Sequence, residues 1–244
     1  MTTLIKYGII RVRKNKREVK KKNVWLKWGA VAACLWILVG IIAMTLQLHG
    51  AGAPKLILSD KSTAKVSYGY EKESTGSGLA SLMYYTEEEM FAREKMYIFR
   101  GKVANLTNIT IDFNGEKEVR CIATVTVRKV YKGKLTVGKQ VRMLLPCGID
   151  IKGGYVEDTG VITQLKIGME GIFMPWIYDD ESYMEMNGAR IMWQDLADCG
   201  LGDGVRWVFL STEKGVLFLR DAYPGAKNAS DLDDIEAYVL EQIS

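Results

Sequence analysis

The sequence predicts a mainly β domain that is held to a membrane by one N-terminal helix, and three observations support this fold class. An apolar run of transmembrane length begins at Trp28 and ends at Leu46. Further along the chain, apolar and polar residues alternate with the period of two that is typical of β-strands. Helical signals follow Thr86 and precede Ile243. We therefore expect a small closed barrel of about five to six strands with short flanking helices.

A basic tail precedes the apolar run. Residues 1–27 contain ten Lys and Arg residues and one acid, Glu18, although the net charge of the whole chain is only +4. Because Lys and Arg stay on the cytoplasmic side of a first span, we expect this tail inside, a transmembrane helix over residues 28–48 in membrane lipid, and all later residues outside. The part that folds outside is mildly acidic, so we expect no nucleic-acid partner.

Two alternatives remain open for the apolar run. Ala51-Gly52-Ala53 has the small-x-small pattern of a signal-peptidase site, although the run is longer than an ordinary signal peptide and Pro54 follows the cut. A buried helix of a globular domain is the second alternative, but such helices normally carry polar residues on one face, and residues 29–43 have none. An uncleaved anchor explains the pattern best.

Residues 49–84 are rich in Ser, Gly, Lys and Tyr and show no sustained apolar period, so we expect a stalk that can contain short strands. The outer domain should span residues 85–244. Its first element is a short helix, because Thr86 and Glu89 have the spacing of a capping box, in which each side chain bonds to the other residue's backbone N–H.

Strands follow this helix. The alternation is longest over residues 119–131, where Cys121 falls on the inward face and is expected to be a buried, inert thiol. Similar patterns predict strands over residues 97–103, 141–145, 171–177, 205–211 and 216–220. Ser230 is the expected cap of a final helix over residues 231–243, which has one apolar face. Closing these strands into a barrel would remove exposed sheet edges.

Catalytic and metal-binding patterns are weak in this chain. The single histidine, His49, lies beside the expected span, and outside the span only Cys121, Cys147 and Cys199 remain, without a C-x-x-C spacing. We therefore expect no cofactor, no zinc site and no Ser-His-Asp or Cys-His catalysis. Ser62 and Lys65 have the S-x-x-K spacing of serine acyltransferases, but the partner motifs are missing. The acidic clusters lack the spacing of a calcium loop.

Three segments carry a resemblance to a known family. Residues 94–103 (EKMYIFRGKV) resemble the first strand of the tissue-inhibitor-of-metalloproteinase and netrin-module families, and residues 125–133 (VTVRKVYKG) resemble a later one. Residues 168–174 (GMEGIFM) are similar to a strand of bacterial relatives of that fold. The resemblance implies an OB-like barrel. Inhibition of metalloproteinases is not implied, because it depends on a free N-terminal Cys that this chain lacks. The basic, Lys-rich sequence that leads into the span resembles the membrane anchors of bacterial extracytoplasmic-signalling proteins. This resemblance implies a bacterial cell membrane.

These observations favour a non-enzymatic, membrane-tethered module that binds a protein, a peptide or an envelope glycan through loops of the barrel. The candidate ligand contacts are Tyr155, Tyr183 and Trp193, since exposed aromatic rings can stack on sugars or anchor a partner. Two alternatives stay open: a carboxylate-dependent envelope hydrolase, and a small subunit of a membrane signalling or assembly complex.

Overall fold

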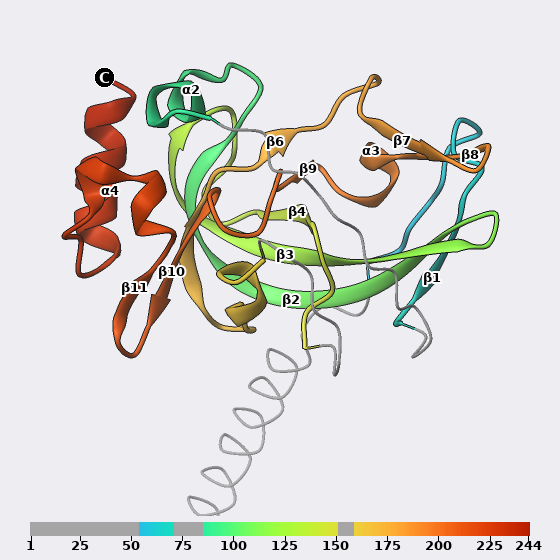
Figure 1. Ribbon diagram of the computed structural model, residues 1–244, viewed down its shortest axis with the longest axis horizontal. Coiled ribbons are helices and arrows are strands. Elements are labelled where there is room, and N and C mark those ends of the chain that lie inside the picture. Colours follow the sequence, from blue (N-terminus) through green and yellow to red (C-terminus); the bar gives the residue numbers. More distant parts are fainter. Residues whose placement is uncertain (1–53, 71–84, 151–158) are drawn as a thin grey trace, which may run out of the picture. The chain divides into compact units, whose positions relative to one another are not determined.

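The computed structural model describes residues 54–70, 85–150 and 159–244, which all belong to the unit Ala51–Ser244 (Figure 1). The expected tail over residues 1–27 and the expected transmembrane helix over residues 28–48 lie outside these ranges. Within the described ranges, no helix has the length and apolar character that crossing a bilayer requires.

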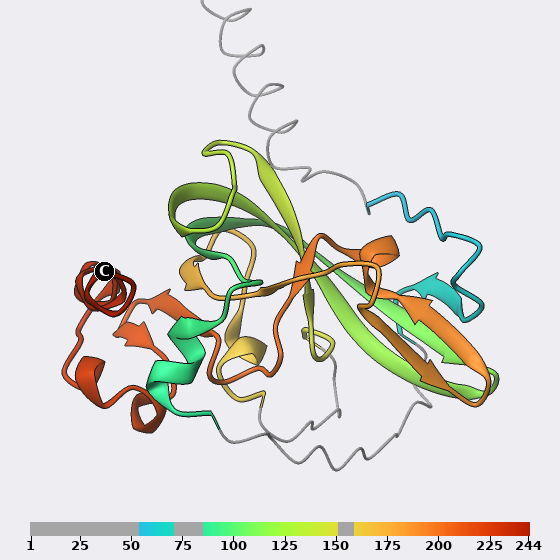
Figure 2. The same ribbon diagram turned by 90° about the horizontal axis from the view of Figure 1, so that it is seen from above.

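The fold is mainly β, as predicted, and is built on one curled sheet with few helices (Figures 1 and 2). Its hydrogen-bonded order is β11-β10-β5-β2-β3-β4-β9-β6, and β1 pairs with β2 beside this path. The strands of this sheet are β1 Lys65–Tyr68, β2 Ile98–Phe113, β3 Glu116–Lys132, β4 Gln140–Leu145, β5 Glu170–Phe173, β6 Trp176–Ile177, β9 Cys199–Gly200, β10 Val208–Thr212 and β11 Gly215–Leu217. A separate hairpin consists of β7 Tyr183–Met186 and β8 Ala189–Met192.

The prediction of a closed barrel with five to six strands is wrong. Nine strands form a curled half-barrel, whose path ends at β6 on one side and at β11 on the other. Closure fails because β6 has only two residues, and its contact with the chain before β2 is a single bridge between Met96 and Trp176. Pro175 separates β5 from β6, so the strand expected over residues 171–177 is broken in two.

A long hairpin of β2 and β3 forms the centre of the sheet. Asn114 and Gly115 make its two-residue turn with φ angles of 55° and 106°, as a type I′ turn requires. Val103 pairs with Val125, and Asn105 pairs with Thr124, so Ala104 is an extra residue in a β-bulge. The bulge turns later odd-numbered side chains of β2 to the opposite face of the sheet.

Two hydrophobic cores result from this change of face. Before the bulge, Ile98, Phe99 and Val103 pack into the larger core, together with Trp207, Phe209 and the C-terminal helix. After the bulge, Ile109, Ile111 and Phe113 pack into a smaller core beneath the β7–β8 hairpin. Figures 1 and 2 both place the tip of this hairpin beside the turn between β2 and β3, where the Asn114 side-chain amide donates to the carbonyl of Asn187.

The helices lie at the margins of the sheet: α2 Glu87–Ala92, α3 Trp193–Leu196 and α4 Leu232–Gln242, with short 3₁₀ turns at Ile162–Gln164, Arg220–Ala222 and Pro224–Ala226. The capping box at α2 is confirmed, because Thr86 and Glu89 bond to each other's backbone. The final helix is also present. Its N-cap is Asp231 rather than Ser230, since the Asp231 carboxylate accepts from the backbone N–H groups of Asp233 and Asp234.

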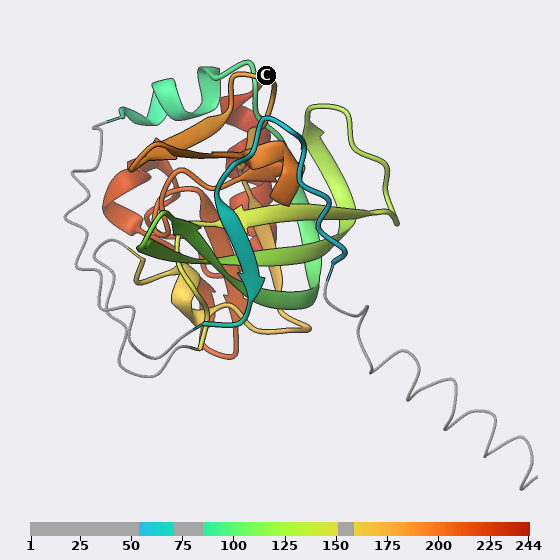
Figure 3. The same cartoon turned by 90° about the vertical axis from the view of Figure 1, so that its right-hand side faces the viewer.

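Part of the segment that we assigned to the stalk contributes to the folded domain. Strand β1 pairs with residues 109–112 of β2, and Figure 3 shows it at the near edge of the sheet. Before β1, Ser59 and Ser62 donate to the carboxylate of Asp195 on α3. The chain is therefore attached to the domain before β1, and the remaining stalk residues, 49–53 and 71–84, lie outside the described ranges.

Candidate functional site

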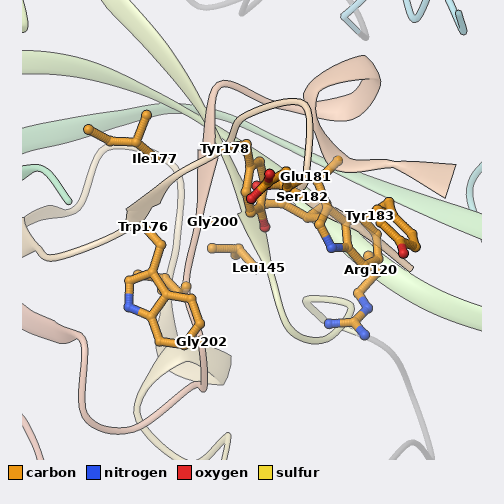
Figure 4. A pocket seen from close by; sticks show the side chains of 13 residues that line it. Arg120, Leu145, Trp176, Ile177, Tyr178, Glu181, Ser182, Tyr183, Gly200 and Gly202 are labelled. Carbon is orange, nitrogen blue, oxygen red and sulfur yellow. The ribbon is translucent and has the colours of Figure 1, made fainter. Parts of the chain in front are cut away.

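A pocket of about 310 Å³ lies where the two cores meet, between the end of β4, strand β9 and the chain that enters the β7–β8 hairpin (Figure 4). Its size falls within the range of about 300–1,000 Å³ that is common for small-molecule sites. The lining combines four aromatic rings, four aliphatic side chains and a few polar groups. These residues are Arg120, Leu144, Leu145, Trp176, Ile177, Tyr178, Glu181, Ser182, Tyr183, Trp193, Gly200, Leu201 and Gly202.

Two aromatic rings form a stacked pair in the wall of this pocket. The centroids of Tyr178 and Trp193 are 6.3 Å apart, and their planes differ by 28°. The guanidinium carbon of Arg120 lies 5.6 Å from the ring centroid of Trp193, so a cation adjoins the π-face. Arg120 is also held by Glu118, whose Oε2 accepts from Nε at 3.1 Å and from Nη2 at 2.7 Å. The guanidinium group therefore has a fixed direction.

Two glycines make room for the rings. A Cβ atom at Gly200 would lie 1.7 Å from the hydroxyl oxygen of Tyr178, and one at Gly202 would lie 2.7 Å from the indole ring of Trp176. Gly200 in strand β9 and Gly202 just after it thus offer a surface without side chains, on which Tyr178 and Trp176 rest. Burial in this place raises the pKa of the Tyr178 hydroxyl, which keeps the phenol neutral and able to donate a hydrogen bond.

The polar side of the pocket is organised by Asp179. Its carboxylate accepts from Lys95 Nζ at 2.6 Å and from the Ser182 hydroxyl at 2.9 Å. The Lys95 and Ser182 hydrogen bonds lower the pKa of Asp179 to about 2. The Ser182 carbonyl accepts from Trp193 N at 2.9 Å, so the same turn fixes the start of α3. Ser182 and the carboxylate of Glu181 are thereby presented beside the aromatic wall.

The predicted contact residues fall in different places. Tyr183 and Trp193 both line the pocket, with Tyr183 about half exposed on β7 at 48% and Trp193 at the start of α3. Tyr155 lies outside the described residues. The sequence does not single out Arg120, Trp176 and Tyr178, because residues in a strand, or directly after one, carry no signal for which of them will come together across the sheet.

The pocket lining contains a single carboxyl group, Glu181, rather than the pair that a carboxylate hydrolase uses. Among described carboxyl groups with a displaced pKa, Asp179, Asp234 and Glu236 all have it lowered by hydrogen bonds. Such groups are stable anions. They stabilise the local structure and are poor proton donors near neutral pH.

The three cysteines outside the apolar run are buried and free. Burial raises the pKa of Cys121 to about 12 and that of Cys147 to about 11, and it also raises the pKa of Cys199. These thiols are protonated at neutral pH and are weak nucleophiles. Within the described part of the chain, no group of three or more His, Cys, Asp and Glu side chains is placed to hold a metal ion.

A second hollow, of about 410 Å³, lies between α2, the end of β3 and the C-terminus. Phe91, Tyr131 and Lys132 contribute to its lining. The Lys132 ammonium group donates to the carbonyl of Phe91 at 2.7 Å, and burial lowers its pKa. Because this ammonium group already bonds to the protein's own backbone, the hollow offers a ligand fewer hydrogen-bonding groups than the aromatic pocket does.

No model of a protein family matches this chain, and no curated protein matches it either. The resemblance to tissue inhibitors of metalloproteinases and netrin modules therefore stays a prediction.

Proposed function

We propose that this protein is a single-pass membrane protein whose outer domain binds an envelope glycan in the aromatic pocket. The observation that carries the proposal is the wall of Tyr178 and Trp193 beside the fixed guanidinium group of Arg120. Sugar rings present apolar C–H faces and polar edges, and a stacked aromatic wall with adjacent hydrogen-bonding groups matches both. A binding module needs no catalytic dyad, which agrees with the single carboxyl group of the lining.

A glycan is favoured over a protein partner by the shape of the site. Protein interfaces are usually broad and bury about 800 Å² per partner, whereas this site is a small concave pocket. Its polar groups, Arg120, Glu181 and Ser182, lie around the aromatic residues and include both donors and acceptors. Hydroxyl groups of a sugar can both donate and accept, so they can bond to each of these side chains.

The membrane anchor is supported by the sequence alone. The apolar run has the length of a span, and the strongly basic tail before it favours a cytoplasmic N-terminus. A reporter fused after Ser244 should therefore be active only in the extracytoplasmic compartment. A reporter that is active in the cytosol would contradict this topology.

The relation to the tissue-inhibitor and netrin families is likewise a proposal. Its support is that β2, β3 and β5, which contain the three similar segments, are neighbours in the sheet. We propose a shared strand arrangement in this part of the domain, without the inhibitory function.

Calorimetric titration of the detergent-solubilised chain with peptidoglycan fragments and with other envelope polysaccharides tests the glycan proposal. Tyr183→Ala is the main variant, because this side chain is half exposed and can be removed without opening a core. We expect an affinity at least about tenfold lower, which corresponds to the loss of a moderate interface contact of over 1 kcal/mol.

Trp193→Phe keeps an aromatic ring and should weaken binding less. Leu240→Ala, at an exposed position on α4, is the control and should bind like the unmodified chain. Two results would contradict glycan binding in this pocket. One is equal affinity of Tyr183→Ala and Leu240→Ala for every bound glycan, and the other is that no glycan binds at all.

A further inference from the structure

We propose that the face formed by residues 54–70 rests on the lipid surface, so that the outer domain is docked on the membrane as well as tethered to it. This inference rests on the proposed anchor but not on glycan binding. It starts from apolar and aromatic side chains that the fold leaves exposed to solvent. Ile57 is 71% exposed, Tyr68 is 51% exposed and Tyr70 is 38% exposed, all within a short stretch of chain.

The exposure of these side chains follows from the local structure. Leu56 and Leu58 pack against the smaller core, so the residue between them in an extended chain, Ile57, points away from it. The Tyr68 hydroxyl donates to the carbonyl of Pro54 and accepts from the backbone N–H of Leu56 at 3.3 Å. The Tyr68 side chain is thereby held against residues 54–56, directly before Ile57, and the two exposed side chains make up an apolar patch on an edge of the domain.

Charge and aromatic character fit the patch to a lipid headgroup layer. Lys55, Lys61 and Lys65 are exposed in the same stretch with a single exposed acid, Asp60, so its net charge is positive, whereas the residues after the apolar run are acidic as a whole. Tyrosine rings are enriched at membrane–water interfaces, and each Lys near an anionic surface contributes about 1 kcal/mol. An apolar patch bordered by lysines is the combination that interfacial segments use.

Chain length limits where the patch can lie. Seven residues separate Leu46, the last residue of the apolar run, from Pro54. Even fully extended, they span at most about 25 Å. From Ser59 onward, the chain is attached to the domain through Asp195. If the run spans the membrane, this face of the domain is therefore held within reach of the lipid surface. Contact with the lipid would remove the exposed apolar patch from water.

Site-specific photo-crosslinking tests the proposal. The full chain, with benzoylphenylalanine at position 57 or 68, is reconstituted into vesicles of phosphatidylcholine with and without phosphatidylglycerol, both carrying a fluorescent lipid. Matched controls carry the same group at Val137 or Ile167, which are equally exposed apolar positions elsewhere. We expect lipid adducts at 57 and 68, more of them with phosphatidylglycerol, and few at the controls.

A Lys61→Gln change should lower the ratio of docked to undocked domain about fivefold on anionic vesicles, the factor that corresponds to about 1 kcal/mol. Lipid adducts at 57 no more frequent than at 137 would overturn the proposal, and so would crosslinks to a second copy of the chain in place of lipid. Resistance of the chain to alkaline extraction from the vesicles is measured in parallel. A chain that is extracted lacks the anchor, whereas an anchored chain without adducts lacks only the docking.

Discussion

At the scale of single residues, Gly200 is the pocket residue that leaves least room for a side chain. It has no side chain, and the Tyr178 hydroxyl fills the space that a Cβ atom would need, at 1.7 Å. Neither group can move freely, because Gly200 belongs to β9 and Tyr178 is stacked on Trp193. The shape of the aromatic wall therefore depends on this one glycine.

We expect Gly200→Ala to destabilise the domain by about 1–3 kcal/mol, the usual cost of overpacking a well-packed site. Displacement of Tyr178 should also weaken ligand binding in the pocket. Urea unfolding measures the first effect, with Gly160→Ala as the control, since nothing lies within 4 Å of a Cβ atom there. An unfolding midpoint identical to that of the control would show that Tyr178 moves aside without cost.

Asp179 determines how the rim of the pocket responds to acid. Its pKa in the folded protein, about 2, is below the ordinary value of 3.8, chiefly because of its hydrogen bonds with Lys95 and Ser182. Stability from a lowered carboxyl pKa is present above the ordinary value and is lost as the pH falls towards the folded value. Asp179 should therefore contribute to acid unfolding between pH about 4 and about 2.

Asp179→Asn should make the unfolding midpoint depend less on pH within this window. Above the window, the pH dependence of the midpoint should be the same as in the unmodified chain. The measurement is the urea midpoint as a function of pH. Asp180→Asn, next in the chain and exposed, is the matched control. The prediction fails if both variants retain the full acid dependence of the unmodified chain.

At the scale of elements, sequence patterns predicted those strands that keep one face inward. The alternation over residues 119–131 corresponds to β3, whose Cys121, Ala123, Val125 and Val127 lie in the larger core. The second half of β2 was missed, because the bulge at Ala104 changes the inward face and breaks the period. The β7–β8 hairpin has no counterpart among the predicted strands, although Asn187-Gly188 between alternating residues is a hairpin signal.

The pocket was predicted only in part, for a physical reason. Tyr183 and Trp193 were singled out as exposed aromatics in a loop, and both line it. Arg120 and Trp176 come from strands distant in sequence, and they reach the same pocket through the pairing of β3 with β4, of β4 with β9 and of β9 with β6. Such encounters depend on sheet order, which local periodicity does not encode.

The bulge at Ala104 can be tested by deleting that residue. Without it, Ile109, Ile111 and Phe113 would face the side of the sheet opposite to the smaller core, leaving that core unfilled. Each of these side chains is fully buried, and removal of one large core side chain already costs about 2–5 kcal/mol. We expect the deletion variant to lose cooperative unfolding and to be cleaved rapidly by protease.

Ala104→Ser keeps the chain length and should behave like the unmodified protein, since the bulge needs a residue rather than this particular side chain. A deletion variant with an unchanged urea midpoint would mean that the register adjusts elsewhere in the hairpin.

At the scale of the whole molecule, a few hydrogen bonds connect the chain before β1 to helix α3. The Asp195 Oδ2 atom accepts from Ser59 N and Ser59 Oγ, both at 2.9 Å, and from Ser62 Oγ at 2.5 Å. Ser62 Oγ in turn accepts from Met192 N. Because Asp195 belongs to α3, next to Trp193, the same short helix holds both the entering chain and the aromatic wall.

Removing the carboxylate in Asp195→Ala should therefore loosen residues 59–62, whose serines bond to it, while the larger core stays folded. Limited digestion of the solubilised full chain with trypsin measures this, because Lys55 and Lys61 lie within or beside the tethered stretch. We expect faster cleavage at these two lysines and an unchanged rate of loss of the remaining domain. Asp180→Ala, which removes an exposed carboxylate from a different loop, should cleave like the unmodified chain. Equal cleavage rates at Lys61 in the two variants would mean that core packing of Leu56 and Leu58, the hydrogen bonds of residues 63 and 64 with Arg190 and the pairing of β1 with β2 hold the segment without Asp195.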